Sequence, residues 1–309
     1  DHRDLHSFPT RRSSDLAFVK ALSIYLMLAI GLKGGLAIKK SDVPLAEILY
    51  ILGAGVSLSI IIPIISYALL RKTTGISRYD AAAICAHYGS VSAVTFGYGL
   101  TFLGNNDISF QGHILTLPPI MEFTAILMGL LLAKRSNRLN SKTKENLFSA
   151  KVLKEVLLNG SIVLLIGGML VGLTANEKAM ASVKPYLIDP FNGILCLFLL
   201  ELGLVAAKGI IDSKNFPIKL AFFGVYMPLL SAAIALGLAY ILGLELGTAI
   251  LLMVLAASAS YIAVPAAIRI AIPEANAGYY ITLSLCVTFP FNLVIGVPLY
   301  TYIAKLFLG

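Results

Sequence analysis

Long apolar stretches separated by short polar loops follow one another along almost the whole chain. A helix needs roughly 20 residues to cross the hydrocarbon core of a membrane, which is about 30 Å thick. Nine stretches reach about this length: 17–37, 44–70, 80–103, 114–133, 156–175, 187–207, 217–242, 246–270 and 278–306. The pattern therefore predicts an all-α, polytopic membrane protein.

Two of these stretches, 80–103 and 246–270, are interrupted near their middle by polar residues. The interruptions consist of His87, Ser90, Ser92 and Thr95 in the first stretch and of Ser258, Ser260, Tyr261 and Pro265 in the second. A helix that breaks inside a membrane exposes backbone groups that lipid cannot satisfy, so breaks persist where they line a cavity or bind a ligand. Paired broken helices in the two halves of a chain are typical of the binding site of a secondary transporter.

The chain also contains an internal repeat. Three landmarks recur 168–172 residues later: Gly31 as Gly203, Ser90 as Ser258 and Pro119 as Pro290. The second half holds five apolar stretches and the first half four, so we expect two inverted five-helix repeats with nine of the ten helices present. The first repeat is expected to cover 17–133 and the second 156–309. The polar residues 1–16 differ in character from the apolar chain after them and are expected to be a non-native tail in place of the first helix.

Composition agrees with a membrane protein and explains the charge. Hydrophobic residues make up 58% of the chain and charged residues 13%, against roughly 25% charged residues in soluble domains. The formal net charge is +8, and seven of the Lys and Arg residues lie in the linker 134–155. This bias predicts that the linker is cytoplasmic. The expected location is a bacterial inner membrane, which the protein spans several times. Because topology accounts for the charge, nucleic acid is not an expected partner.

Two acidic residues, Glu122 and Glu201, fall inside apolar stretches. A charge at mid-membrane costs roughly 2.5–3.5 kcal/mol on insertion scales, so such residues face a cavity or a partner. We expect Glu122 to support the adjacent break and Glu201 to pair with Lys33 or Lys208. A structural ion pair or a protonated core acid is the alternative for each. Lys33 and Lys208 are otherwise expected to be anchors whose ammonium groups reach the membrane surface.

Motifs of enzymatic chemistry are absent from the sequence. It lacks the G-x-x-x-x-G-K-[ST] loop of nucleotide-driven pumps and the H-E-x-x-H run of metalloproteases. Its three cysteines, Cys85, Cys196 and Cys286, have neither the spacing of a metal site nor that of a disulfide framework. His87 has no further metal-ligating residues at a suitable spacing, so it is expected to line or pack the first break. We therefore expect a protein that is not an enzyme.

Five short runs carry a resemblance to a known family. They are IGLKGG at 30–35, SVS at 90–92, PIMEF at 119–123, LELGL at 200–204 and AASASYIAVPAAIRIAIPEAN at 256–276. With these runs the chain resembles the sodium-dependent bicarbonate transporter family over 17–309, and is closest to its broad bacterial permease branch. The resemblance implies ten helices in an inverted five-plus-five arrangement, with crossed broken helices that hold bicarbonate and sodium. It also implies a homotrimer in membrane lipid and an elevator-like movement of one helical domain against another.

The resemblance also implies where the ligands bind. The implied binding residues are Ser90 and Ser92 in the first break and Ser258 and Ser260 in the second, and their hydroxyls are the expected sodium ligands. Val91, Ala259 and Tyr261 complete the expected substrate and ion site, which Glu122 and Glu201 support. The leading interpretation is a symporter that takes up bicarbonate, or another small anion, with sodium as the coupling ion.

Two departures from the family pattern bear on this interpretation. The second break reads Ser258, Ala259, Ser260, Tyr261 where cyanobacterial members have S-S-S-D, so a phenol replaces a natural sodium ligand. The linker 134–155 is far shorter than theirs, so a regulatory partner of the PII type does not follow from the resemblance. The alternative interpretation is a cation/proton antiporter or an exporter of another small anion, with proton coupling through Glu122 or Glu201. A transport-inactive scaffold or sensor is a third.

Overall fold

Helices form nearly all of the chain that the computed structural model describes, and that part contains no strand. The described residues are 11–40, 44–137, 160–212, 216–262, 264–265, 268 and 272–309. Most of the expected tail, most of the expected linker and much of the far end of the 246–270 stretch lie outside them. The all-α class expected from the apolar pattern is confirmed.

Each expected apolar stretch corresponds to helical structure at its described residues. The first half folds into α1 (Arg11–Lys40), α2 (Leu45–Thr73), α3 (Arg78–Gly89), α4 (Ala93–Asn105), the 3-10 turn η1 (Gly112–Thr116) and α5 (Leu117–Asn137). The second half folds into α7 (Gly160–Thr174), α8 (Glu177–Leu187), α9 (Phe191–Asp212), α10 (Ile218–Ile241), α11 (Leu246–Ala257) and a helical rod over 277–308. The short polar helix α8 was not expected, because its sequence mixes charged and apolar residues within a predicted loop. It begins where the Asn176 side chain accepts a hydrogen bond from the Ala179 N–H at 2.8 Å.

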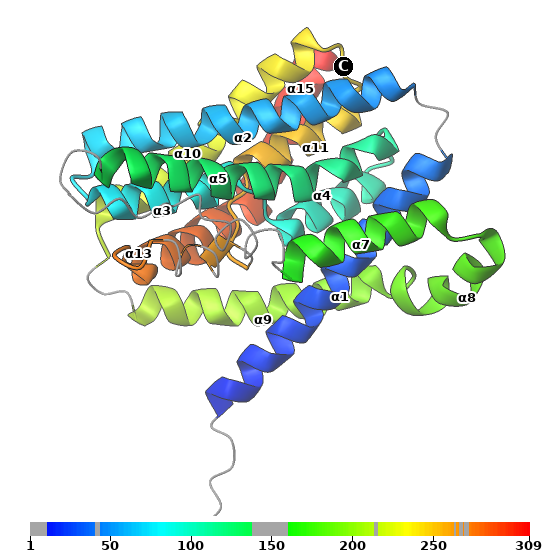
Figure 1. The fold of residues 1–309 in the computed structure, drawn as a ribbon, viewed down its shortest axis with the longest axis horizontal. Helices are drawn as coiled ribbons and strands as arrows, with labels where there is room; N and C mark the ends of the chain where they lie inside the picture. The colour runs from blue at the N-terminus through cyan, green and yellow to red at the C-terminus, as the bar shows by residue number, and fades with distance from the viewer. Residues whose placement is uncertain are drawn as a thin grey trace, which may run out of the picture.

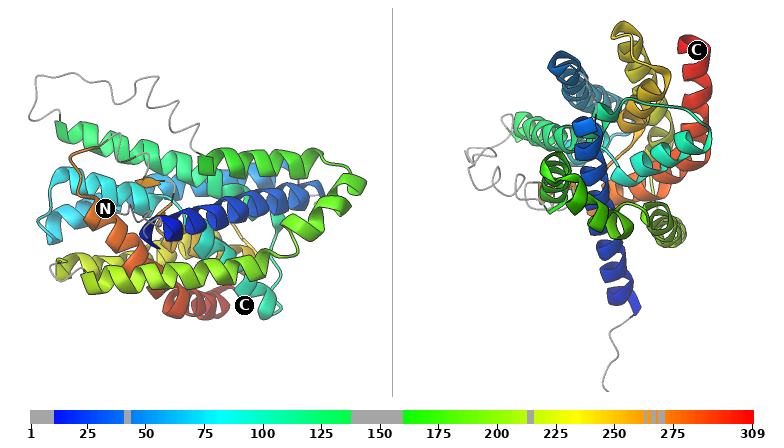
Figure 2. Two further views of the ribbon diagram at one scale, coloured as in Figure 1. Left: turned by 90° about the horizontal axis from the view of Figure 1, so that it is seen from below. Right: turned by 90° about the vertical axis from the view of Figure 1, so that its right-hand side faces the viewer.

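The helices run roughly along one axis, and α1 crosses the others obliquely (Figure 1). α2, α3 and α5 pack against one another, while α10 packs against α11. α1 packs along α7 and also contacts α9, as the turned views of Figure 2 show. Glycines allow the close approach of α1 and α7: a Cβ atom on Gly168 would lie 2.7 Å from the carbonyl oxygen of Leu28. Small residues at such contacts are typical of helices that associate in membranes.

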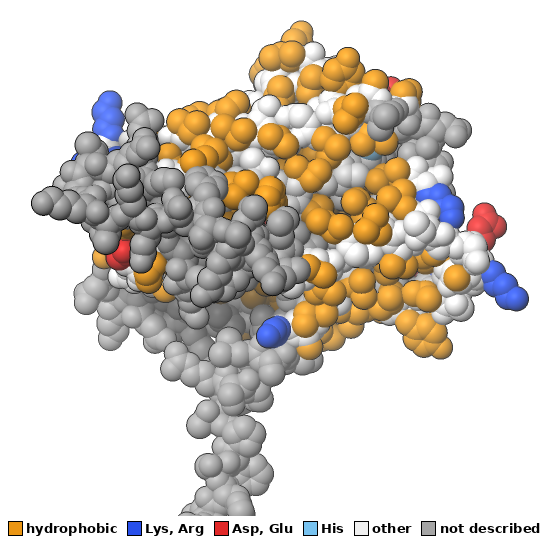
Figure 3. Space-filling model, viewed as in Figure 1, with side chains coloured by type: hydrophobic (Ala, Val, Ile, Leu, Met, Phe, Trp, Pro, Cys, Tyr) orange, Lys and Arg blue, Asp and Glu red, His pale blue; other side chains and the backbone are white. Residues whose placement is uncertain are grey.

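On the face of the bundle seen in Figure 3, the described surface is largely apolar. By length and composition, five spans of the described chain can cross a membrane: Ala46–Thr73, Gly112–Ala133, Glu177–Leu204, Ile218–Ile241 and Ala277–Leu308. Exposed basic residues lie at the two ends of the bundle, with Arg71 and Lys72 at the α2–α3 turn and Lys178 and Lys184 on α8. A bilayer would cover such an apolar belt and leave the charged ends in water. The chain is therefore a multi-pass membrane protein.

The last rod is continuous, but its winding changes along its length. It consists of α13 (Ala277–Ile281), η2 (Thr282–Thr288), α14 (Phe289–Phe291), η3 (Asn292–Gly296) and α15 (Val297–Leu308), of which η2 and η3 are π-helical. Each π segment comes shortly before a proline, Pro290 or Pro298. Proline has no N–H and its ring collides with the carbonyl four residues earlier, so a wider turn before it relieves the clash.

Candidate functional site

The first interrupted stretch breaks as the polar residues predict. α3 ends at Gly89, and Ser90 turns the backbone to an extended conformation with φ −89° and ψ 179°. α4 begins three residues later, where the Ser92 hydroxyl accepts a hydrogen bond from the Thr95 N–H at 3.1 Å. Serine is a favoured residue at this position because its oxygen satisfies a backbone N–H that the first helical turn leaves free.

The second interrupted stretch breaks at the position that the repeat predicts, and the two breaks meet. α11 ends at Ala257, and Ser258 is extended with φ −81° and ψ 163°. The backbone N–H of Ser92 donates to the Ser258 hydroxyl at 2.9 Å, and that hydroxyl donates to the Leu255 carbonyl at 2.8 Å. One buried serine side chain therefore satisfies backbone groups of both broken helices.

His87 forms a second link between the breaks. Its carbonyl accepts a hydrogen bond from the Ser260 N–H at 3.0 Å, and its Nδ1 lies 2.5 Å from the Ser260 carbonyl oxygen. Because a carbonyl can only accept, this Nδ1 carries the proton. The ring is fully buried and stacks on Tyr280 with centroids 4.7 Å apart. The expectation that His87 packs the break is met, but the sequence did not indicate its bonds to Ser260.

A small cavity lies where the breaks meet. It is lined by Met27, Val91, Ser92, Ala93, Glu122, Ser260, Tyr261 and Ile262 and has a volume of about 10 Å³, which is close to the space that one water molecule requires. Glu122, on α5, is only 2% exposed, and its Oε1 accepts a long hydrogen bond of 3.4 Å from the Ser260 hydroxyl. The cavity is thus large enough for a small cation and too small for an anion of four heavy atoms.

The expected site residues divide into three groups. Val91, Ser92, Ser260, Tyr261 and Glu122 line the cavity. Ser258, Ser90 and Ala259 are buried beside it: Ser258 joins the two breaks, and the Ser90 hydroxyl has no hydrogen-bond partner among the described residues. Glu201 is half-buried on α9 and does not line the cavity.

The expected pairing of Glu201 is not found with Lys33. Within the described chain no ion pair joins these two residues. The Lys33 ammonium instead lies 3.6 Å from the centre of the Phe191 ring, at the start of α9. Since the side chain of Lys208 lies outside the described residues, a pair between Glu201 and Lys208 stays a prediction.

Asn292 is a residue of the site that the sequence reading missed. It is 1% exposed, and its Nδ2 donates to the carbonyl of Ala257, the last residue of α11, at 2.8 Å. Its Oδ1 accepts a hydrogen bond of 2.8 Å from the Tyr300 hydroxyl. A lone amide in the otherwise apolar stretch 278–306 was the available signal, because such groups in membrane helices form hydrogen bonds to neighbouring elements.

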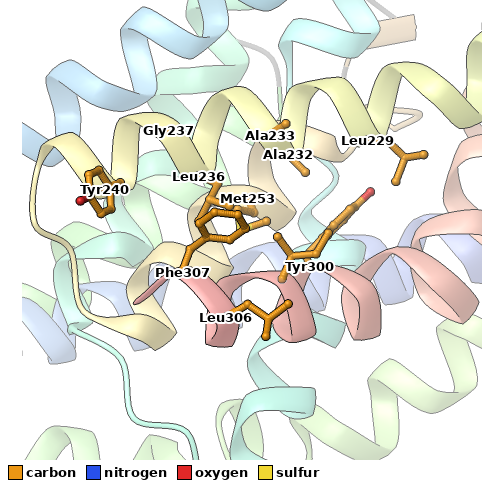
Figure 4. Close-up of a pocket in the computed structure, with 11 residues that line it drawn as sticks. Leu229, Ala232, Ala233, Leu236, Gly237, Tyr240, Met253, Tyr300, Leu306 and Phe307 are labelled. Atoms are coloured by element: carbon orange, nitrogen blue, oxygen red, sulfur yellow. The ribbon is translucent and has the colours of Figure 1, made fainter. Parts of the chain in front are cut away.

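A much larger cavity lies apart from this site. It has a volume of about 810 Å³ between α10, α11 and α15, and it is lined by Leu229, Ala232, Ala233, Leu236, Gly237, Tyr240, Met253, Tyr300, Ile303, Leu306 and Phe307 (Figure 4). The lining is apolar except for two tyrosine hydroxyls, so it offers little to an ion. The larger cavity is therefore not the candidate site, which is the small cavity where buried polar groups converge.

Comparison with known proteins adds a family to this geometry. A family model described as the Na⁺-dependent bicarbonate transporter superfamily matches residues 13–305. A search of curated proteins finds no match. The match includes both broken helices and every residue that lines the small cavity between them.

Proposed function

Because the chain belongs to the Na⁺-dependent bicarbonate transporter superfamily, we propose that it is a sodium-coupled symporter that takes up bicarbonate through the site between its two broken helices. Transporters of this family are not enzymes, and nothing in the site calls for bond-making chemistry. The observation that carries the proposal is the hydrogen bond from the Ser92 N–H to the Ser258 hydroxyl, which brings both breaks to one buried cavity. A ligand bound there contacts both halves of the chain, so its binding can change how the halves are arranged.

The oxygen atoms around the cavity suit sodium. Hydroxyl and carboxylate oxygens are the ligands that hard cations prefer, and Ser92, Ser260 and Glu122 present them at the cavity wall. Ser90 and Ser258 lie beside the cavity, and in our proposal they join the ligand set when the breaks move. The unpartnered hydroxyl of Ser90 supports this role.

The anion is proposed to bind at the start of α4. Ser92 and Ala93 line the cavity at this helix end, and the N–H groups and dipole of a helix N-terminus favour negative charge. Since the cavity has room for one water-sized particle, bicarbonate binding requires the breaks to separate. We propose that sodium binds first and that the anion enters as the cavity widens.

The wider architecture follows the family. We propose two inverted repeats, 17–133 and 156–309, joined by the cytoplasmic linker 134–155, in a homotrimer in a bacterial inner membrane. The packing of α1 on α7 and α9, apart from the group of α2, α3 and α5, supports two bodies that move against each other in an elevator-like manner. We propose no regulatory partner of the PII type, because the linker is short.

Uptake by purified protein in liposomes tests the proposal. An inward sodium gradient should stimulate the uptake of radiolabelled bicarbonate well above the level in protein-free liposomes and above the level with a potassium gradient of the same size. The uptake should saturate in both ions. If sodium does not stimulate uptake of bicarbonate or of a similar small anion, the proposal is wrong.

A second candidate function is proton-coupled transport of an anion or cation on the same architecture. The observation that favours it is the burial of Glu122. Within the described chain, its hydrogen-bond partner is the Ser260 hydroxyl rather than a Lys, Arg or His side chain. Transport by Glu122→Gln distinguishes the two candidate functions. The control is Glu201→Gln, which changes a half-buried acid that does not line the cavity. Proton coupling predicts transport that follows a pH gradient without sodium and is lost in Glu122→Gln. Sodium coupling predicts that the same variant needs more sodium.

A further inference from the structure

One face of α4 leads from the cavity toward the end of the bundle that carries α8. Ala93 lines the cavity, and Gly97 and Thr101 follow at four-residue intervals, which places all three on one side of the helix. Thr101 donates from its hydroxyl to the Asn192 side chain of α9 at 3.1 Å, near the exposed end. The contact between α4 and α9, called the seam below, is therefore polar at its exposed end. Further in, the same face of α4 carries the small residues Gly97 and Ala93.

Phe191 closes this seam. A Cβ atom on Gly97 would lie 3.2 Å from the far edge of the Phe191 ring, so the ring already fills the space that a side chain at 97 would need. The ring is 1% exposed although it belongs to the first residue of α9. Gly97, beside which the ring lies, falls on α4 between the cavity residue Ala93 and the exposed pair formed by Thr101 and Asn192.

Lys33 lies directly on the ring that closes the seam. Its ammonium group is 3.6 Å from the centre of Phe191, and the residue is half-buried on α1. Among the described residues no carboxylate lies within 4 Å of it, and the nearby Asp189 forms its ion pair with Lys184 at 3.8 Å. A cation over an aromatic face gains roughly 0.5–2 kcal/mol, which does not neutralise its charge. A half-buried cation that has no acid of the described chain in contact, with Asp189 acting on it from beyond 4 Å, is a candidate for a functional role.

We propose that Lys33 selects anions at the entrance to the serine site and that Phe191 is the ring that closes this entrance. Lys33 is six residues beyond the cavity residue Met27 on α1, which corresponds to about 9 Å along the helix. An anion that enters between α4 and α9 meets this ammonium before it reaches the N-terminus of α4. Since the Phe191 ring beside it is apolar, the field of the Lys33 ammonium is weakly screened there and raises the local concentration of anions.

The proposal rests on the proposed function, anion transport. It assigns to Lys33 the selection of anions at the entrance, a role that the serines of the site do not have. Uptake by Lys33→Gln is the direct test. We expect the half-saturating concentration of bicarbonate to rise about tenfold, since steering by a single-signed cleft changes encounter by 10-fold or more, while Lys33→Arg stays within about threefold of wild type. Lys39→Gln is the matched control, because Lys39 is an exposed lysine of the same helix whose ammonium bonds to the Ala175 carbonyl. An unchanged half-saturating concentration in Lys33→Gln would overturn the proposal.

A labelling experiment tests the entrance without requiring transport. Ser92→Cys is introduced in a Cys196→Ser background, because Cys196 is exposed while the other cysteines, Cys85 and Cys286, are buried. Anionic and cationic methanethiosulfonate reagents of similar size are then compared in labelling rate. We expect the ratio of anionic to cationic rates to fall about tenfold when Lys33→Gln is added, and both rates to rise when Phe191→Ala is added.

The two readouts separate the possible failures. If wild type transports no bicarbonate but the labelling ratio depends on Lys33, the proposed function is wrong and the anion-selecting entrance stands. If wild type transports and neither readout depends on Lys33, the entrance proposal is wrong and the function stands. Should Lys33→Gln fail to fold, Lys33→Arg decides the question: a labelling ratio that differs from wild type by more than about threefold, despite the retained charge, contradicts the proposal.

Discussion

The two broken helices carry the same Ser-x-Ser pattern, yet different partners hold them in place. In the first break, Ser92 uses its hydroxyl to cap its own helix and the Ser90 hydroxyl has no partner in the described chain. In the second, the hydroxyls of Ser258 and Ser260 both bond to groups of the first half, the Ser92 N–H and the Glu122 carboxyl. The serine hydroxyls of the first break thus bond within that break or have no partner among the described residues, whereas those of the second also bond to groups that are distant in sequence. Substitutions at the second break should therefore cost more stability and disturb both helices.

The largest loss of stability is expected for Asn292→Leu. This change keeps the branching of the side chain but leaves two buried groups without a partner, the Ala257 carbonyl and the Tyr300 hydroxyl. Each costs roughly 1–3 kcal/mol, so we expect the free energy of unfolding to fall by about 2–6 kcal/mol, measured by denaturant unfolding in detergent. The control Tyr300→Phe removes one of the two bonds and should cost about 1 kcal/mol. Equal effects of the two variants would show that the bond to Ala257 does not hold the second break.

A smaller loss is expected for Ser258→Ala, with Ser90→Ala as its matched control in the first break. Removing the Ser258 hydroxyl leaves the Ser92 N–H buried without an acceptor, which costs about 1–3 kcal/mol. The Ser90 hydroxyl has no partner to lose, so Ser90→Ala should change the free energy of unfolding by less than about 0.5 kcal/mol. Thermal unfolding of both variants checks the difference, and a larger cost for Ser90→Ala would reverse the comparison of the two breaks.

Ser260→Ala should change stability little and sodium dependence more. Its hydrogen bond to Glu122 is 3.4 Å long, so its loss should cost no more than about 1 kcal/mol. The same hydroxyl is a proposed sodium ligand, and losing one of a few oxygen ligands should raise the half-saturating concentration of sodium about tenfold. Sodium titrations of bicarbonate uptake measure this. Unchanged sodium dependence would exclude Ser260 from the sodium site.

The architecture was predictable because membrane insertion imposes a simple rule on sequence. Spans must be apolar and long, so each expected stretch corresponds to helix, and polar interruptions such as Ser90–Ser92 mark where a span cannot stay regular. The repeat even predicted which interruption belongs with which. These signals are local in the chain or depend only on its periodicity.

The partners within the site were not predictable, because they depend on how distant helices cross. The contact of His87 with Ser260 joins residues 173 positions apart, and that of Asn292 with Ala257 is made by a residue that follows a π segment, whose winding the sequence did not indicate. The position of Lys33 shows the same limit. Its sequence context indicated an anchor at the membrane surface, whereas the approach of α9 places Phe191 beneath its ammonium group.

The sharpest test of how the second break depends on the first concerns Tyr261. The residue is half-buried at the cavity, and its ring packs edge-to-face on Phe289 with centroids 5.3 Å apart, a contact worth roughly 0.5–1.5 kcal/mol. It occupies the position where resembling transporters have an acid, so in this chain the carboxylate at the cavity comes from Glu122 in the first half. Tyr261→Asp should give the second break a carboxylate of its own.

Two carboxylates at one small cavity repel each other unless a cation lies between them. Tyr261→Asp should therefore lower the half-saturating concentration of sodium about fivefold, while Tyr261→Asn, which is similar in size but neutral, should not. The decisive measurement is the double variant of Tyr261→Asp with Glu122→Gln. If the two positions supply the same ligand, the added aspartate should restore most of the sodium dependence that Glu122→Gln loses. If the double variant is as impaired as Glu122→Gln alone, Glu122 acts by holding Ser260 in place rather than by binding sodium, and the second break is then stabilised by the first half without sharing an ion with it.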